Sequence, residues 1–353
     1  MKKIWKYLLA VGIVLGGCAR MNDDIARFTP EITGTDAVST SYSILLKANV
    51  TRADGISEYG FCYGEGVADK RLPADNLADG QFSVNIAGLK PETEYLFYAY
   101  ISNGISEITS TPQVITTMKE PLPDDRIEIP DPVFRDYILW NFDSDKDGFL
   151  SYAEAQKIKK IDIVSDELES LEGMQNFRNL EQVNASGVPN GGDGLSNGKL
   201  TRIDLSGNPN LRRLDLDYQN IIELDLSANL NLVHVGLYKS PIRRLDISAN
   251  VNLVVFGTGH CQLDSVDLSN NPKLEEVHLD RNRLQKIKVG DNDRMWYLDV
   301  SGNILDKLDV SGCPHLQELH CRDNALLDTI FIKTGQTFKV FNHDDSVKIV
   351  AKD

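Results

Sequence analysis

The chain has 353 residues, of which 41% are hydrophobic, so it can hold two or three folded domains and is not a disordered tail. Its formal charge is −15, from 52 acidic and 37 basic residues. Because nucleic-acid phosphates are bound by basic surfaces, this charge argues against a nucleic-acid partner. An acidic surface suits divalent cations or a basic partner instead.

The N-terminus has the pattern of an export signal. Residues 1–17 contain early lysines and then an apolar run shorter than the roughly 20 helical residues that span a bilayer. The stretch "LGGC" that ends at Cys18 resembles the lipobox of bacterial lipoproteins. The resemblance implies that residues 1–17 are removed, that Cys18 is diacylated, and that the acyl chains anchor the protein in a membrane. A plain cleaved signal is the alternative.

Residues 18–26 form a predicted tether, "CARMNDDIA". Asp23 and Asp24 resemble the acidic tag that sends some lipoproteins of the Bacteroidota to the outer face of the outer membrane. That resemblance implies an outer-membrane protein exposed at the cell surface. A solvated spacer explains the same residues equally well.

Residues 27–117 are predicted to be all-β. Alternating apolar runs such as "YSILLKANV" and "EYLFYAYI" are separated by turn-rich pieces such as "RADG". The region resembles a fibronectin type III domain, with Leu89, Pro91 and Tyr95 at the positions of its tyrosine corner. The resemblance implies a two-sheet sandwich that acts as a spacer or binding module. The proline-rich and acidic residues that follow predict an extended linker over 118–130.

The stretch "DSDKDGFLSYAE" has the spacing of a calcium-binding loop, inside a predicted cap over residues 131–157. Calcium prefers oxygen donors in this order, and carboxylates this close repel one another without a cation. The stretch resembles an EF-hand, although Ala155 stands where that family usually has a bulky apolar residue. An acidic turn that caps the second helix is the alternative. The six expected ligand positions are Asp143, Asp145, Asp147, the Phe149 carbonyl, Ser151 and Glu154.

Only one such loop is present in the sequence, which argues against a cooperative calcium sensor. It runs directly into the first repeat of the next segment. A terminal coil of a solenoid needs cover for its apolar face. We therefore expect one structural calcium ion, in a helix pair that caps the repeats.

Residues 158–336 repeat the apolar pattern LxxLxL at steps that alternate between 11 and 10 residues, a true period of 21. Such a period is typical of a solenoid. The repeats resemble the leucine-rich repeats of the internalins, which implies a parallel sheet on a concave face. The cysteine ladder of some internalins is missing, since Cys321 alone keeps its column, and we expect buried thiols. Residues 337–353 are assigned to a C-terminal cap.

Two polar columns of the repeats are predicted to be structural, because buried amides at each corner of a coil need partners. One begins at Asp204 and the other at Asn208. The insertion "PNGGDGLSNG" (189–198) exceeds the repeat length, and such loops on rigid scaffolds often carry recognition.

The outward positions of the predicted strands form a candidate ligand face. Gly236, Gly257 and Gly259 would leave a depression with an aromatic rim, which suits sugars or peptide side chains. Ordinary variation along strands is the alternative. Two histidines and an aspartate on adjacent strands could also hold a transition metal, although a solvated face explains them too. The candidate residues are Arg213, Asp215, His234, Tyr238, His260, Glu276, His278, Tyr297, Asp299, Glu318 and His320.

We expect no enzymatic activity, because no catalytic motif stands out. The stretch "HLQELH" (315–320) superficially resembles a zinc-protease motif, but Leu316 and Leu319 are in repeat register, which makes it a turn and a strand rather than a helix. The favoured function is a monomeric, non-catalytic binding or adhesion lipoprotein that presents its concave face to a protein or glycan partner. The alternatives are an accessory glycan-capture lipoprotein in nutrient uptake and a purely structural envelope spacer.

Overall fold

The computed structural model describes residues 28–74, 77, 79–189 and 198–353. The chain divides into one unit that ends at Glu120 and a second that begins at Pro121. The predicted signal peptide, the tether with Cys18 and most of the 189–198 insertion lie outside the described residues. In the part of the chain that is described, no helix is long and apolar enough to cross a membrane.

The first unit is an antiparallel β-sandwich, which confirms the predicted fold. One sheet has the order β1-β2-β5; the other has the order β4-β3-β6-β7, with β8 also paired to β6. Inward side chains alternate with outward ones, as in β2, and the inward ones fill one core. The strands are β1 (Glu31–Ser39), β2 (Ile44–Thr51), β3 (Glu58–Glu65), β4 (Lys70–Pro73), β5 (Gln81–Ile86), β6 (Glu94–Ser102), β7 (Glu107–Thr109) and β8 (Gln113–Thr116).

The tyrosine corner is present in this sandwich. Tyr95, near the start of β6, is buried, and its hydroxyl accepts a hydrogen bond from the Lys90 N–H at 3.1 Å. Leu89 is buried beside it. The contact fixes the loop that enters β6, which is the structural role that the motif predicts.

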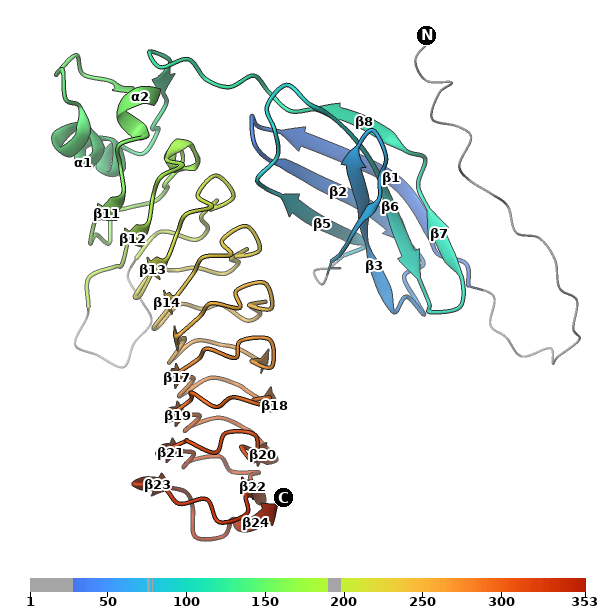
Figure 1. Ribbon diagram of the computed structural model, residues 1–353, viewed down its shortest axis with the longest axis vertical. Helices are drawn as coiled ribbons and strands as arrows, with labels where there is room; N and C mark the ends of the chain where they lie inside the picture. Colours follow the sequence, from blue (N-terminus) through green and yellow to red (C-terminus); the bar gives the residue numbers. More distant parts are fainter. Residues whose placement is uncertain (1–27, 75–76, 78, 190–197) are drawn as a thin grey trace, which may run out of the picture. The chain divides into compact units, whose positions relative to one another are not determined.

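The second unit is a solenoid, in which Figure 1 shows the coils stacked from α1 and α2 at one end to β23 and β24 at the other. Its main sheet has nine parallel strands, each three residues long and in register with the next. This confirms the predicted leucine-rich-repeat architecture. The strands are β11 (Lys160–Asp162), β12 (Gln182–Asn184), β13 (Arg213–Asp215), β14 (His234–Gly236), β15 (Val255–Gly257), β17 (Glu276–His278), β19 (Tyr297–Asp299), β21 (Glu318–His320) and β23 (Val340–Asn342).

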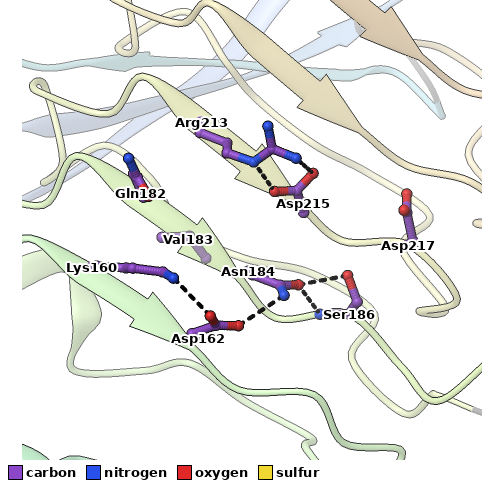
Figure 2. Close-up of a pocket in the computed structure, with 9 residues that line it drawn as sticks. All are labelled: Lys160, Asp162, Gln182, Val183, Asn184, Ser186, Arg213, Asp215 and Asp217. Carbon is purple, nitrogen blue, oxygen red and sulfur yellow. Dashed lines mark hydrogen bonds and ion pairs between the residues drawn. The ribbon is translucent and has the colours of Figure 1, made fainter.

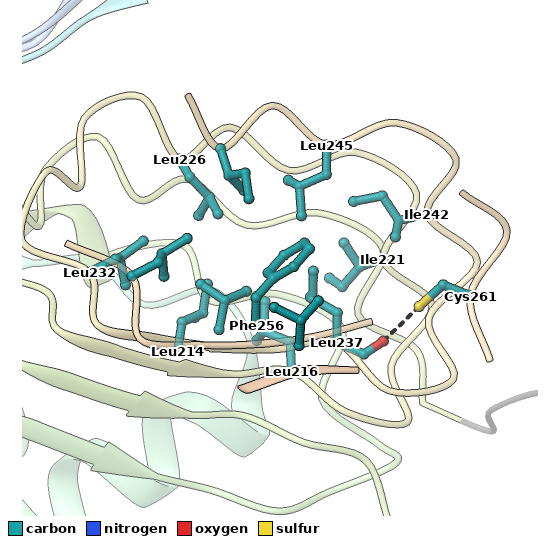
Figure 3. Packing of buried hydrophobic residues seen from close by; sticks show 14 of the residues in the cluster. Leu214, Leu216, Ile221, Leu226, Leu232, Leu237, Ile242, Leu245, Phe256 and Cys261 are labelled. Carbon is teal, nitrogen blue, oxygen red and sulfur yellow. Dashed lines mark hydrogen bonds between the residues drawn. The ribbon is translucent and has the colours of Figure 1, made fainter. Parts of the chain in front are cut away.

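The solenoid core is filled by the LxxLxL side chains. The middle residue of each three-residue strand points inward, so Leu214, Val235 and Phe256 lie one above another and are fully buried. Figure 3 shows their neighbours packing against them, with the Cys261 thiol donating to the Leu237 carbonyl at 2.9 Å. Each coil thus covers the apolar face of the coil before it.

Buried asparagines join the coils on the side away from the main sheet. The Asn229 amide donates to the carbonyls of Leu205 and Asn208, and the same pattern recurs at Asn250 and Asn271. A second ladder, which we did not predict, serves the other half-repeat. There the amides of Asn282, Asn303 and Asn324 donate to carbonyls of the previous and the same coil.

Short strands also form on the second face of the solenoid. One pair is β16 (Ser265–Asp267) with β18 (Lys286–Lys288), and β20 (Lys307–Asp309), β22 (Thr329–Lys333) and β24 (Lys348–Lys352) form the other sheet. Residues 337–353, assigned to a C-terminal cap, carry β23 and β24. Both strands extend existing sheets in register, so these residues continue the solenoid as its last coil.

The segment assigned to a linker belongs to the second unit from Pro121 onward. Its two-residue strand β9 (Arg126–Ile127) pairs with β10 (Leu150–Ser151). Ile129 is 5% exposed and lies in the same core as the repeats. The segment is therefore not an extended linker from Pro121 onward, because its apolar residues Ile127 and Ile129 pack against the cap and the repeats.

Candidate functional site

The acidic loop lies between α1 (Pro132–Phe142) and the short α2 (Tyr152–Ala155). One carboxylate oxygen from each of Asp143, Asp145 and Asp147 lies within 4.8 Å of the others. The loop closes on itself, because Asp143 accepts hydrogen bonds from the N–H groups of Lys146 and Gly148. Both of those donors have left-handed backbone, with φ of 61° and 84°. Three hard oxygen donors on a preformed turn fit a calcium ion.

Glu154, expected to close the loop, is close to it but outside this cluster of three carboxylates. Its carboxylate accepts hydrogen bonds from the N–H and hydroxyl of Ser144 and from the N–H and hydroxyl of Ser151. Burial opposes ionisation of Glu154, but these hydrogen bonds outweigh it and lower the pKa to about 2. The group is therefore an anion that spans both ends of the loop, which is the charge state that a calcium ligand requires.

The strand β9 supplies the loop with a pairing partner. In β10, Leu150 pairs with Ile127 and Ser151 with Arg126. The Arg126 guanidinium also lies 3.4 Å from the centroid of the Phe149 ring. Preceding residues of the same chain therefore cover the edge of the loop strand, so a single loop needs no second copy beside it.

The cap is fixed to the first coil by buried polar contacts. Asp131 begins α1, where its side chain accepts from the Phe134 N–H, and its second oxygen accepts from the N–H groups of Glu169 and Ser170. The Tyr137 hydroxyl accepts from the Asp162 N–H, at the end of β11. Together with the shared apolar core, these bonds join the acidic loop to the start of the main sheet.

The outward side chains of the nine-stranded sheet, together with the residues just after each strand, form what we term the sheet face. All eleven residues of the candidate ligand set lie on it, from β13 to β21. Their environments differ along the sheet: a polar pocket occupies the first strands, glycines the middle, and rings with carboxylates the later strands.

The pocket has a volume of about 340 Å³. Figure 2 shows its side chains gathered over β11, β12 and β13, where Asn184 links Asp162 to Ser186 by hydrogen bonds. The Lys160 ammonium lies 2.8 Å from the Asp162 carboxylate, so these charges are paired within the pocket. The pocket is lined by Lys160, Asp162, Gln182, Val183, Asn184, Ser186, Arg213, Asp215 and Asp217.

Arg213, Asp215 and His234 form one cluster at the edge of this pocket. The Arg213 guanidinium donates to both Asp215 oxygens, at 2.6 and 3.0 Å, and His234 Nε2 lies 2.9 Å from the same carboxylate. Burial opposes ionisation of Asp215, but the bonds from His234 and Arg213 hold its pKa below the usual range. The cluster is a rigid, charge-compensated part of the face.

Glycines open the middle of the face. A Cβ atom on Gly257 would meet no atom closer than 3.8 Å, whereas one on Gly259 would clash with the Asp280 carboxylate at 2.5 Å. His260 Nε2 lies 3.5 Å from Asp280, and its ring centroid is 5.0 Å from that of Tyr238. The structure therefore brings Tyr238 and His260 together near Gly257, whereas the Asp280 carboxylate lies close to Gly259, and the depression stays a prediction.

Further along, Tyr297 stands between two histidines. Its ring centroid lies 4.7 Å from that of His278 and 5.4 Å from that of His320. The only group of three or more ligand side chains close enough to share a metal ion, among the described residues, is the aspartate trio of the acidic loop. His278, Asp299 and His320 are not brought together in this way, and the Tyr297 ring lies between the two imidazoles.

Sequence reasoning missed the first strands of the pocket. The frame from Ile158 to Ile163 and the copy "LEQVNASG" from Leu180 already place the pocket side chains in the same columns as Arg213 and Asp215. That signal was available, but the long insertion after residue 189 hides the continuity of these columns with the later repeats. The missed residues are Lys160, Asp162, Gln182, Asn184 and Ser186.

Comparisons with known proteins give only distant likenesses. No protein-family model and no curated protein matches the chain. The functional domain of InlJ from Listeria monocytogenes, which includes a cysteine ladder, is 16% identical over 66% of this chain and 65% of its own, with a TM-score of 0.39. The internalin InlF of the same organism is 16% identical over 66% of this chain and 98% of its own, with a TM-score of 0.23.

The third fibronectin III domain of the human KIAA0343 protein is 16% identical over 31% of this chain and 99% of its own, with a TM-score of 0.20. This chain spans just under two thirds of the InlJ domain. TM-scores this low carry no function from any of these proteins, so the architecture here rests on the strand registers and burial described above.

Proposed function

We propose that this chain is a non-catalytic binding or adhesion protein of the cell surface, held by lipid on Cys18, with the sheet face as its recognition surface and one structural calcium ion in the cap. The observation that carries the proposal is the contrast between the two sides of the repeats. The aspartates of the second face cap the N–H groups of Ser227, Ser248 and Ser269 in the same way in successive coils. The sheet face instead varies from coil to coil and stays open.

A second candidate, glycan capture for nutrient uptake, is favoured by the pocket alone. Planar amides and carboxylates joined by hydrogen bonds, as at Asp162 and Asn184, can donate to and accept from sugar hydroxyls. In that case Gln182, Asn184 and Arg213 would contact the sugar, and the later strands would contribute little.

The test is binding of the full chain to arrays of glycans and of purified proteins. Gly257→Trp is expected to abolish a signal that depends on the middle of the sheet face, because it places a large side chain there at a position where a Cβ atom meets no atom closer than 3.8 Å. Ile222→Trp is the matched control, since Ile222 is 56% exposed and lies outside the main sheet. Glycan signals that survive Gly257→Trp would favour capture at the pocket, and blank arrays would favour the structural spacer.

A further inference from the structure

The two halves of the sheet face differ in how their negative charges are compensated. At the pocket end, Asp162 has Lys160 and Asp215 has Arg213 within 3 Å. Those carboxylates are already partnered inside the protein. A ligand there would have to compete with existing ion pairs.

On the later strands β17, β19 and β21, the carboxylates lack such cations. No lysine or arginine nitrogen lies within the 4.0 Å ion-pair limit of Glu276, Asp299 or Glu318 in the described part of the chain. Imidazoles lie beside two of them, with His278 Nε2 3.8 Å from Glu276 and His320 Nε2 4.0 Å from Glu318, and Asp299 accepts a hydrogen bond from the Ser301 N–H at 2.9 Å. With neutral histidines this group carries three uncompensated negative charges. We term these six residues the acidic strip: Glu276, His278, Tyr297, Asp299, Glu318 and His320.

The rings of the acidic strip pack against one another beside its carboxylates. Tyr297 packs against both histidines, and Trp296 lies 5.7 Å from Tyr297, centroid to centroid. The Glu276 and Glu318 side chains are 40% and 33% exposed, so a ligand can reach them.

The electrostatic effect of this arrangement is visible in neighbouring groups. Burial raises the pKa of Asp280, and the Asp299 charge raises it further. Burial likewise raises the pKa of Tyr297 to about 12, with contributions from Asp299, Asp280 and Glu318. The carboxylates of the strip therefore raise the pKa of groups on or beside neighbouring strands, in the same direction as burial.

We propose that the acidic strip docks a basic segment of a protein partner, through arginine or lysine side chains that lie against its rings and carboxylates. This inference rests on the proposed function, in which the sheet face meets a partner. Carboxylates beside aromatic rings suit guanidinium and ammonium groups, and arginine best, because it can pair and stack at once. A neutral glycan over the strip would leave three carboxylates uncompensated, and nucleic acid would be repelled.

The test uses the full chain and two fluorescent peptides of equal length, one rich in arginine and one rich in glutamate, followed by anisotropy. The arginine-rich peptide is expected to bind, more weakly as salt rises, and the glutamate-rich peptide is not. The pair Glu276→Gln and Glu318→Gln should weaken binding about ten-fold, since it removes two half-exposed counter-charges without changing side-chain size.

The control pair is Glu172→Gln and Glu223→Gln, which removes the same charge at exposed positions outside the main sheet. Thermal melting of both pairs checks that they fold. Equal weakening by both pairs would overturn the proposal, because the effect would then be one of net charge. Absence of binding by the arginine-rich peptide, or binding unchanged by the strip pair, would overturn it as well.

Failure of this inference is distinguishable from failure of the proposed function. A partner found on the arrays that is lost with Gly257→Trp but kept with the strip pair would leave the sheet face as the recognition surface. In that case only the basic partner would be ruled out. A partner whose binding falls with both changes would support the two proposals together.

Discussion

Aspartates of this chain do two different jobs, and the position of each within the repeat decides which. On the second face, the Asp267 carboxylate accepts hydrogen bonds from Ser269 and Lys288. These bonds outweigh the effect of burial and lower its pKa. On the sheet face, burial is the main influence on Asp217 and Asp280, and it raises their pKa. A buried aspartate with a raised pKa lowers folding stability at neutral pH, where it is ionised, and such costs are common at functional surfaces.

Asp280→Asn is therefore expected to raise the melting temperature at pH 7. Because its folded-state pKa is raised, Asp280 supports folding fully below the ordinary value of 3.8, and that support is lost as pH rises through the raised pKa. The gain from the substitution should thus vanish as pH falls below that value. The measurement is thermal melting across this range, with the exposed Asp264→Asn as control. A melting temperature at pH 7 equal to or below that of the unchanged chain would contradict the assignment.

At the scale of elements, the acidic loop illustrates what spacing can and cannot reveal. Its acidic positions are local in sequence, so the spacing alone brings Asp143, Asp145 and Asp147 together. Its pairing partner β9 is two residues long, too short for any periodicity, and lies in a stretch whose prolines and acids predict a linker. Contacts of this kind depend on the folded cap and leave no local pattern.

The same limit applies to the sheet face. The burial of the middle residue of every strand follows from the 21-residue period, because stacked coils place each such residue in the same apolar core. For the outward residues the period predicts which ones align on neighbouring strands. It does not predict which side chains touch, since ring stacking depends on side-chain rotamers. The separation of His278 from His320 by Tyr297 is a case in which the column positions suggested a cluster that the side chains do not form in this structure.

Ile129→Ala is expected to destabilise the second unit by about 2–4 kcal/mol, because Ile129 is nearly fully buried in the repeat core and its loss leaves a cavity. Glu128→Ala, one residue earlier and exposed, should have little effect. Urea unfolding followed by circular dichroism, with the tryptophan fluorescence of Trp140 and Trp296 in the second unit as a second signal, would measure both. Equal stability of the two variants would mean that the segment before α1 is a linker after all.

At the scale of the whole molecule, the two units have separate cores. One buried cluster runs without interruption from Ile129, before the acidic loop, to Val347 in the last coil. The cluster of the sandwich shares no residue with it. Stabilisation of the cap should therefore spread through the solenoid and stop at the boundary beside Pro121.

Calorimetry of the full chain is thus expected to show two transitions, of which calcium shifts one. Calcium at 100 times its dissociation constant would add about 2.7 kcal/mol to the folded state that binds it. A chelator should lower the solenoid transition by the corresponding amount and leave the sandwich transition in place. Asp145→Asn, which removes one exposed carboxylate of the trio, should abolish that shift, whereas Asp136→Asn on α1 should preserve it. If the chelator moves neither transition, the loop is an acidic turn rather than a calcium site. If it moves both, the two cores are coupled in a way that their separate packing does not explain.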